Sequence, residues 1–444
     1  MAAAIDRLSA DDLMSLDGDH GTVPMQVGGV LWLEQGRLRP DELRAHLAAR
    51  LPAAPRLRQV MHRVPPGCGR PVWVDDPGFD LDAHLAVRPA AGDTEVDDLA
   101  IALLTTPLPR DRPLWAATMA VAADGSVRAF VLVVHHVLAD GLAALAVLAA
   151  LADGSAPPPG VFPQPLPSRA ALRADNIAGR LAGLRRLPVA AWELVMAVRL
   201  VVGSGAVATS SLNRPTGPRR SLVAVERDLD AVRAAAHRCG GTVNDVALAV
   251  VAGALGDVLR ARGEDVATLV CSVPFAYHAP GSPRGNASAV MPLAVPAGGS
   301  VPERVAATAA VTAAAKRRPR ALGNAILRPA FRLLVRTGWF RRYIDSQRRV
   351  NTIVTNVRGP VTPLLLAGCP VERIVPLTVA TGNLTVAFAV FSYAGRLSIT
   401  AMADPEAVPD LDRLAAALDA GLAALLGAGG DQGFATTVTP ASPR

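Results

Sequence analysis

Apolar and polar positions along the chain follow two spacings, one typical of strands and one typical of helices. In the first part of the chain, short apolar runs predict buried strands at 27–34 and 127–136. Apolar positions at helical spacing predict helices over 8–17, 40–51, 94–107 and 141–152. Ser9 stands just before the first of these helices, where a hydroxyl can cap the helix.

The part of the chain after residue 215 repeats this alternation. Strands are predicted at 221–227, 268–274, 287–295, 352–356, 384–392 and 396–403. Helices are predicted at 229–238, from 242 onward and at 409–426, with a basic helical region at 321–349. The pattern therefore predicts an α/β (α+β) protein in which helices pack on mixed sheets.

A change in composition divides the two halves. Residues 155–169 carry six prolines between short polar ends, which is typical of a linker. The stretch 173–202 that follows mixes arginines with apolar residues at helical spacing. We therefore expect an N-terminal domain over 1–154, a Pro-rich linker and basic amphipathic helix over 155–214, a C-terminal domain over 215–429 and a disordered tail over 430–444.

Composition narrows the class of protein. Half of the residues, 51%, are hydrophobic, which predicts a folded chain with an aliphatic core because aromatic residues make up only 4%. The formal net charge of +7 comes almost entirely from arginine. This charge either reflects biased codon use or attracts anionic partners such as phosphates and acidic membrane surfaces. The four cysteines are far apart in the sequence, which predicts reduced thiols and no metal site.

The first residues, MAAAIDRLSADDLMSL, are acidic where an export signal would be basic and apolar. The longest uncharged stretches are interrupted by proline and glycine, so none predicts a membrane span. We expect a soluble or peripheral protein in a cytoplasmic setting.

The stretch HHVLADG, residues 135–141, is the strongest candidate for chemistry. It places His135 and His136 at the end of a predicted buried strand and Asp140 and Gly141 at the start of a predicted helix. Successive side chains of a strand point to opposite faces, which argues against a metal shared by the two histidines. Two buried histidines with backbone partners are one interpretation, and a neutral imidazole acting as a general base is the other.

At these residues the chain resembles the bacterial wax ester synthase/acyl-CoA:diacylglycerol acyltransferase family, which has the HHxxxDG motif of CoA-dependent acyltransferases and condensation domains. Other segments resemble the same family in order along nearly the whole chain. They are RPLWAATM (112–119), NRPTGPRR (213–220), TVNDVALAVVAGAL (242–255), RGNASAVMPL (284–293), TNVRGPVTPLLLAGCPVERIVPL (355–377) and SYAGRLSITAMADPEAVPDLDRLAAAL (392–418). The chain departs from the family pattern at Arg358 (usually Pro), at Gln26 (commonly His) and in the loop 277–286.

The resemblance implies two CoA-dependent-acyltransferase-like domains with an active-site channel at their interface. It implies that His136 is the general base for direct transfer, that His135 assists packing or substrate positioning, and that Asp140 holds an arginine and is architectural. Gly141 leaves room for the backbone or a ligand. Direct transfer agrees with the lack of a G-x-S-x-G nucleophile motif. Asn244 is a candidate for a polar substrate contact or a helix cap, and Asp245 for orienting a neighbour or capping the same helix.

The implied reaction moves a fatty acyl group from acyl-CoA, as co-substrate, to the hydroxyl of diacylglycerol, and it needs no cofactor and no metal. The implied partners are acyl-CoA, a lipid alcohol and a membrane or lipid-droplet surface. Basic amphipathic stretches at 178–202 and 328–349 fit such a surface or, equally, ordinary packing between domains. We expect a cytoplasmic protein attached peripherally to the inner face of the plasma membrane or to lipid droplets.

Several alternatives stay open at this point. The acceptor is a fatty alcohol in a wax ester synthase, or an alcohol of secondary metabolism in a specialised enzyme. A third possibility is a catalytically silent binding or lipid-droplet coat protein, against which the intact His136 and Asp140 argue. Binding of nucleic acid has only net charge in its favour, because no aromatic platform or known motif supports it.

Overall fold

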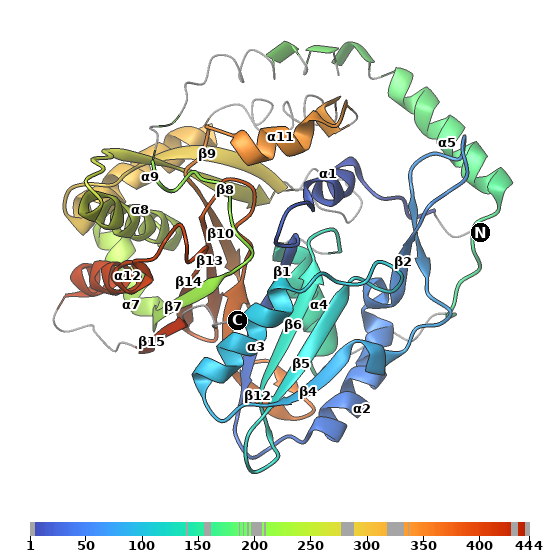
Figure 1. Cartoon of the computed structure of the whole chain (residues 1–444), viewed down its shortest axis with the longest axis horizontal. Helices are drawn as coiled ribbons and strands as arrows, with labels where there is room; N and C mark the ends of the chain where they lie inside the picture. The colour runs from blue at the N-terminus through green and yellow to red at the C-terminus, as the bar shows by residue number, and fades with distance from the viewer. Residues whose placement is uncertain are drawn as a thin grey trace.

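The structure is a computed structural model of the chain. It describes residues 5–138, 141–154, 161–185, 187–189, 191–192, 195–196, 207, 210–276, 288–317, 333–335, 337–427 and 434–439. Two sheets dominate the described part, and Figure 1 shows them side by side, each with helices of its own. The predicted α/β architecture with mixed sheets is confirmed.

The first sheet has six strands in the order β11-β12-β1-β6-β5-β4. Their bounds are Leu365–Leu366, Cys369–Leu377, Gln26–Leu33, Val127–His135, Trp115–Val121 and Leu85–Pro89. All neighbours pair antiparallel except β4 and β5, which are parallel. The close approach of β1 and β6 requires glycine, because a Cβ on Gly28 would lie 2.1 Å from the carbonyl oxygen of Leu132.

The second sheet has seven strands in the order β15-β7-β14-β13-β10-β8-β9. Their bounds are Phe434–Thr439, Ser221–Asp228, Arg396–Ala403, Val386–Tyr393, Thr352–Arg358, Thr268–Ala276 and Ser288–Pro296. β10 pairs in parallel with both β13 and β8, whereas the other neighbours are antiparallel. This mixed pairing requires crossover connections, which the helices supply.

Ten helices longer than one turn lie in the described part of the chain. Their bounds are α1 Ala10–Gly18, α2 Pro40–Arg50, α3 Asp93–Thr105, α4 Gly141–Leu151, α5 Arg169–Leu184, α7 Leu229–Arg238, α8 Val243–Ala261, α9 Val301–Arg317, α11 Trp339–Ser346 and α12 Leu411–Leu426. A two-stranded ribbon, β2 (Gln59–His62) with β3 (Val72–Asp75), lies beside the first sheet. Short 3₁₀ turns cover Leu51–Ala53, Pro55–Arg58 and Leu81–Ala83.

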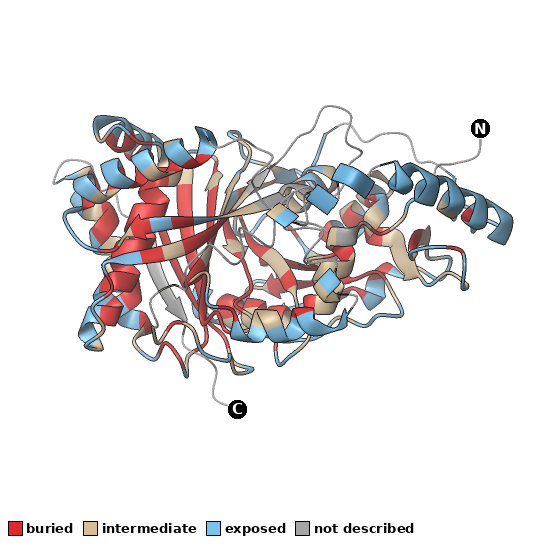
Figure 2. Cartoon of the chain, turned by 90° about the horizontal axis from the view of Figure 1, so that it is seen from above, coloured by how far each residue is buried: buried red, intermediate tan, exposed pale blue. Residues whose placement is uncertain are grey.

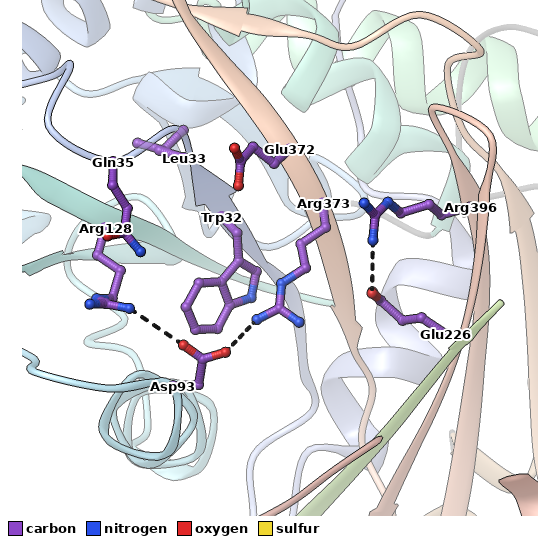
Figure 3. A pocket seen from close by; sticks show the side chains of 9 residues that line it. All are labelled: Trp32, Leu33, Gln35, Asp93, Arg128, Glu226, Glu372, Arg373 and Arg396. Carbon is purple, nitrogen blue, oxygen red and sulfur yellow. Dashed lines mark hydrogen bonds and ion pairs between the residues drawn. The ribbon is translucent and has the colours of Figure 1, made fainter. Parts of the chain in front are cut away.

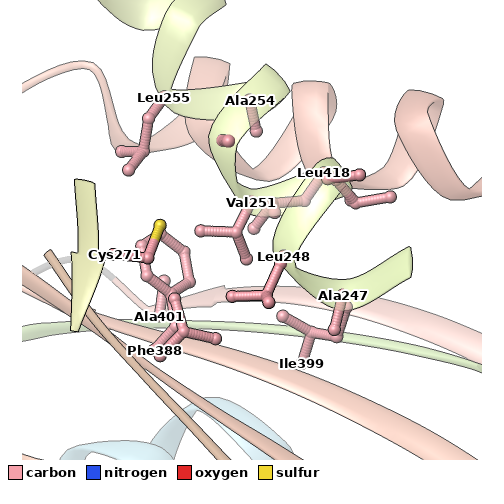
Figure 4. Close-up of a cluster of buried hydrophobic side chains, with 14 of the residues drawn as sticks. Ala247, Leu248, Val251, Ala254, Leu255, Cys271, Phe388, Ile399, Ala401 and Leu418 are labelled. Atoms are coloured by element: carbon pink, nitrogen blue, oxygen red, sulfur yellow. The ribbon is translucent and has the colours of Figure 1, made fainter. Parts of the chain in front are cut away.

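The largest core lies between the second sheet and the helices α7, α8, α9 and α12. Leu248 and Val251 of α8, Leu418 of α12 and Phe388 of β13 meet there, as Figure 4 shows. Nearly every residue of α8 is buried, so its apolar sequence is explained by packing. No single helix in the described residues is long and apolar enough to span a membrane, and the one bent pair that passes by length and composition is α7 with α8.

The structure corrects two sequence predictions and adds one helix that the sequence pattern missed. Residues 434–439 of the predicted disordered tail form β15, whose alternating FATTVT sequence pairs with the exposed edge of β7. The helix α9 was not predicted, because its buried stripe consists of Val, Thr and Ala and gives little amphipathic contrast. The division at 215 does not separate the sheets, because β11 and β12 of the C-terminal half complete the first sheet.

Candidate active site

The two histidines lie where the first sheet faces the second domain. His135 is the last residue of β6 and pairs with Gln26 at the start of β1. A turn follows at 136–138, and Gly141 begins α4, so the predicted junction of strand and helix is confirmed. Asp140 lies outside the described residues, and its predicted contact with an arginine stays a prediction.

His135 is almost completely buried, with 3% of its surface exposed. Its Nδ1 accepts a hydrogen bond from the backbone N–H of Val137 at 3.1 Å. Because Nδ1 is an acceptor, the neutral ring carries its proton on Nε2. Nε2 lies 3.2 Å from Oδ2 of Asp19, a close electrostatic contact whose angle falls outside that of a well-aligned hydrogen bond.

Asp19 connects this histidine to the loop before β1. Its Oδ1 accepts the backbone N–H of Met25 at 2.8 Å, and its Oδ2 accepts from Arg110. Burial alone would raise the pKa of Asp19, but the contacts with His135, Met25 and Arg110 lower it to about 2. The carboxylate is therefore charged throughout the neutral pH range.

His136 is held by its backbone and is less buried than His135. Its N–H donates to the carbonyl of Met25 at 2.8 Å, and its side chain is half-buried. A half-buried imidazole at a domain junction can exchange a proton with a substrate hydroxyl, whereas the buried His135 is positioned by protein groups. The two rings therefore differ in burial, and the roles predicted for them stay predictions.

Loops of the C-terminal half border this corner of the molecule. The hydroxyl of Thr381 lies 3.6 Å from the sulfur of Met25, and the hydroxyl of Thr22 donates to the carbonyl of Thr216 at 3.3 Å. The N–H of Thr216 donates in turn to the carbonyl of Gly382 at 3.1 Å. The segments 213–220 and 378–384 therefore meet the loop 19–25 beside the histidine motif.

Asn244 is the second residue of α8, and its Oδ1 accepts from Nδ2 of Asn356 on β10 at 3.1 Å. The predicted capping role of Asn244 is wrong, because Thr242 is the N-cap of α8. Asp245 supplies the other half of this capping box, accepting from Thr242 and also from the hydroxyl of Thr312 at 2.7 Å. The predicted capping role of Asp245 is therefore confirmed.

Gln26 stands where the family commonly has histidine, and it is fully buried. Its Nε2 donates to the carbonyls of Leu104 at 2.8 Å and Thr106 at 3.0 Å, and its Oε1 accepts from the N–H of Leu108 at 3.1 Å. Gln26 thus satisfies the last carbonyls of α3 next to His135. Arg358, the other departure, is exposed at the end of β10.

Arg220, in the segment NRPTGPRR, is buried and donates to the backbone carbonyls of Gly217, Arg219 and Ala380. Burial lowers the pKa of Arg220 to about 10, against the opposing effect of Asp404. Asp404 accepts the N–H of Gly217 at 2.6 Å. These contacts fix the segment that leads from the linker into β7.

A second feature lies at the opposite end of β6. A cavity of about 320 Å³ is lined by Trp32, Leu33, Gln35, Asp93, Arg128, Glu226, Glu372, Arg373 and Arg396. Figure 3 shows Asp93 between the guanidinium groups of Arg128 and Arg373, at 3.5 Å and 2.8 Å. Arg373 also lies 4.1 Å above the ring of Trp32.

The two-domain architecture and the histidine motif define a protein with the fold of condensation domains and related acyltransferases. The first condensation domain of the calcium-dependent antibiotic synthetase matches with a TM-score of 0.62 at 18% identity, covering 99% of this chain and 100% of that chain. A wax ester synthase/diacylglycerol acyltransferase from Marinobacter aquaeolei matches with a TM-score of 0.67 at 23% identity, covering 95% and 98%. Because both structures are less than 25% identical to this chain, the similarity establishes the fold alone.

Sequence comparison establishes the family. The profile of the wax ester synthase/diacylglycerol acyltransferase catalytic domain matches residues 8–247, and that of the C-terminal domain of the same family matches residues 285–426. A probable diacylglycerol O-acyltransferase of Mycobacterium tuberculosis is 29% identical over 94% of this chain and 95% of its own length. A second protein of that organism, provisionally named for the same activity, is 32% identical over 83% of each chain. The chain belongs to the wax ester synthase/diacylglycerol acyltransferase family and is an acyltransferase.

Sequence reasoning missed several residues beside the histidines. Asp19, Met25 and Thr381 come from loops with no motif of their own, and only folding brings them to the end of β6. Asn356 lay within the segment that resembled the family, but its hydrogen bond to Asn244 was not foreseen. Asn356 could therefore have been found from the family motif that contains it, whereas no feature of the sequence pointed to Asp19.

Proposed function

We propose that the protein transfers a fatty acyl group from acyl-CoA to the hydroxyl of diacylglycerol, forming triacylglycerol, with His136 as general base. The observation that carries this proposal is the half-buried His136 at the end of β6, beside a second histidine that protein groups hold in place. Family membership and the names of the mycobacterial relatives support the substrates.

In the proposed step, a ring nitrogen of His136 takes the proton of the acceptor hydroxyl as its oxygen attacks the thioester carbonyl. The carbon–sulfur bond breaks, and the imidazolium returns the proton to the departing CoA thiolate. An ester and free CoA are the products, and no cofactor or metal is needed. The base contributes about 10²- to 10⁴-fold, and positioning of the two substrates supplies much of the remainder.

The first experiment measures CoA release and lipid product with palmitoyl-CoA and diacylglycerol, and in parallel with a long-chain fatty alcohol. We expect triacylglycerol from the wild type and its loss in His136→Ala. The matched control is His237→Ala, which removes an exposed histidine from the last turn of α7. Wax ester as the main product would identify a fatty alcohol as the acceptor, and full activity of His136→Ala would exclude this residue as the base.

We also propose that the protein works at a lipid surface on the cytoplasmic side, the inner face of the plasma membrane or a lipid droplet, because its acceptor is insoluble in water. Among the described residues, the outer face of α5 fits such a surface. Ile177, Leu181 and Leu184 follow one another at helical spacing and are 57%, 57% and 58% exposed. Arginines 173, 180 and 185 are exposed on the same helix or directly after it, which suits anionic headgroups.

The inner face of α5 is already occupied. Leu172 is buried with Cys68 and Val72, and Asp175 accepts from Arg7 at 2.5 Å. Only the outer face is thus available, and Figure 2 shows α5 as an exposed arm at the edge of the molecule.

Flotation with vesicles of neutral and of anionic phospholipid tests this face. Leu181→Glu should weaken binding to anionic vesicles about tenfold, because burial of one leucine contributes about 1.5 kcal/mol or more. Val361→Glu, which alters another highly exposed apolar residue, is the matched control and should bind as the wild type does. Equal binding by both variants would show that α5 does not contact the lipid.

A further inference from the structure

A carboxylate outside the recognised motif contacts His135 directly and is linked to His136 through the backbone of Met25. Asp19 follows α1 as its C-cap residue, and its side chain is 11% exposed. The carboxylate oxygens divide their contacts, with Oδ1 on the Met25 N–H and Oδ2 between His135 and Arg110. Asp19 therefore lies in the loop between α1 and β1, in contact with the histidine that precedes the candidate base.

We propose that Asp19 is a positioning residue that fixes the orientation of the histidine pair for acyl transfer, which rests on the function proposed for His136. It acts by two routes, through the ring of His135 and through the backbone of His136. No substrate contact is assigned to it.

The first route fixes one tautomer of His135. The Val137 N–H occupies Nδ1, so the Nε2–H faces the carboxylate of Asp19 at 3.2 Å. A flipped ring would place a C–H against the carboxylate and lose the acceptor for Val137. The combination of one donor and one charged acceptor therefore permits a single ring orientation.

The second route fixes the backbone of His136. Asp19 accepts the N–H of Met25, and the carbonyl of the same residue accepts the N–H of His136, both at 2.8 Å. Asp19 thus holds the N–H of the residue whose carbonyl holds the backbone of the candidate base. A shift of Met25 would move the backbone from which the imidazole of His136 extends.

The loop that carries Asp19 is itself anchored on both sides. His20 lies 3.0 Å from Asp345 of α11, and Arg341 donates to the carbonyl of Asp17 at 3.2 Å. Figure 1 shows α1 and α11 side by side, and these contacts join them. The position of Asp19 is therefore set by rigid elements, as positioning of a reacting group requires.

Asp19→Asn is the decisive variant, because it keeps size and shape but places an amide N–H against either His135 or the Met25 N–H. We expect kcat to fall about 10- to 100-fold, the scale of a small misplacement of a reacting group, with little change in the KM for acyl-CoA. Asp153→Asn makes the same chemical change beside another histidine, His46, whose Nδ1 lies 3.4 Å from Asp153 outside the contacts that hold Asp19, and it should keep kcat within about twofold. Wild-type kcat in Asp19→Asn would overturn the proposal.

A second measurement does not depend on catalysis. In ¹⁵N-histidine NMR spectra, with His135 assigned by a His135→Gln variant, the wild type should show the Nε2–H tautomer. Asp19→Asn should change this signal, whereas Asp153→Asn should not. An unchanged His135 signal in folded Asp19→Asn would refute the positioning role, even if no acceptor tested were acylated and the proposed function had failed.

Discussion

The two ends of β6 carry charged and polar groups of opposite character. His135 ends the strand, and Arg128 lies seven residues earlier, about 23 Å away at the usual rise per residue. At the Arg128 end, three guanidinium groups (Arg128, Arg373, Arg396) face three carboxylates (Asp93, Glu226, Glu372) around one cavity. At the His135 end, one carboxylate lies against the buried histidine and accepts the N–H of Met25.

The two ends of β6 therefore suit different tasks. The charge cluster contributes to stability, and the histidine end carries the candidate base. Arg373 of β12 contacts Asp93 of α3 and lies close enough to oppose the rise that burial causes in the pKa of Glu226 of β7, so the cluster connects the first sheet to the second domain. Its formal charges cancel, and Asp93 and Glu226 each lie beside an arginine. The His135 end instead presents a half-buried imidazole beside loops of both halves.

The largest expected effect belongs to the histidine end. His136→Gln should lower kcat/KM about 10²- to 10⁴-fold, equivalent to about 3 to 5 kcal/mol of the barrier. The free energy of unfolding should change by less than about 0.5 kcal/mol, since the backbone contact with Met25 remains. Urea unfolding and steady-state kinetics on the same preparation check both values. If His136→Gln lowered both the free energy of unfolding and kcat/KM, the histidine end would contribute to stability as well, and the two ends of β6 would no longer differ in this respect.

The opposite result is expected at the other end. Arg373→Met keeps an apolar side chain but removes the guanidinium that faces Asp93 and lies over Trp32, which should lower the free energy of unfolding by about 1 to 3 kcal/mol. Because the cluster is far from His136, kcat should stay within about threefold. Arg37→Met, in the exposed pair with Glu34, is the matched control and should cost less than about 1 kcal/mol. A large loss of kcat with unchanged stability would place Arg373 in catalysis.

The sequence predicts those elements whose determining residues lie close together along the chain. The helix at 229–238 and the strand at 396–403 were predicted at the bounds observed for α7 and β14, because spacing and capping residues lie within each segment. The histidine pair was found for the same reason, since its residues are adjacent. The predicted helix at 94–107 is two residues longer at its end than α3, where Gln26 from a distant strand satisfies the carbonyls of Leu104 and Thr106.

The features that the sequence does not predict depend on contacts between segments that are far apart along the chain. Nothing in the sequence of β12 indicates that it leaves the second domain and pairs with β1, and Asp19 resembles any acidic residue after a short helix. Edge pairing likewise decided the structure of β15, because a short alternating segment is ordered only where a strand edge accepts it. The positioning of the candidate base was therefore less predictable than the base itself.

The smallest expected effect concerns Glu226 and depends on pH. Burial raises the pKa of Glu226 above its ordinary value of 4.5, against the opposing charges of Arg373 and Arg396, which lies 3.9 Å away. Between the ordinary and the raised value, the folded protein holds a proton that the unfolded chain has released. Rising pH therefore lowers the contribution of this group to stability across that window.

Glu226→Gln removes this dependence. We expect its stability relative to the wild type to improve as pH rises through the window above 4.5, measured by urea unfolding at steps up to about pH 8. Glu264→Gln controls for the loss of a carboxylate elsewhere, where Glu264 accepts the N–H of Ser211 at 2.8 Å. If the difference between Glu226→Gln and wild type is constant with pH, Glu226 titrates normally. The charge cluster would then hold the domains together by fixed ion pairs alone, and the two ends of β6 would differ in their partners but not in their response to protons.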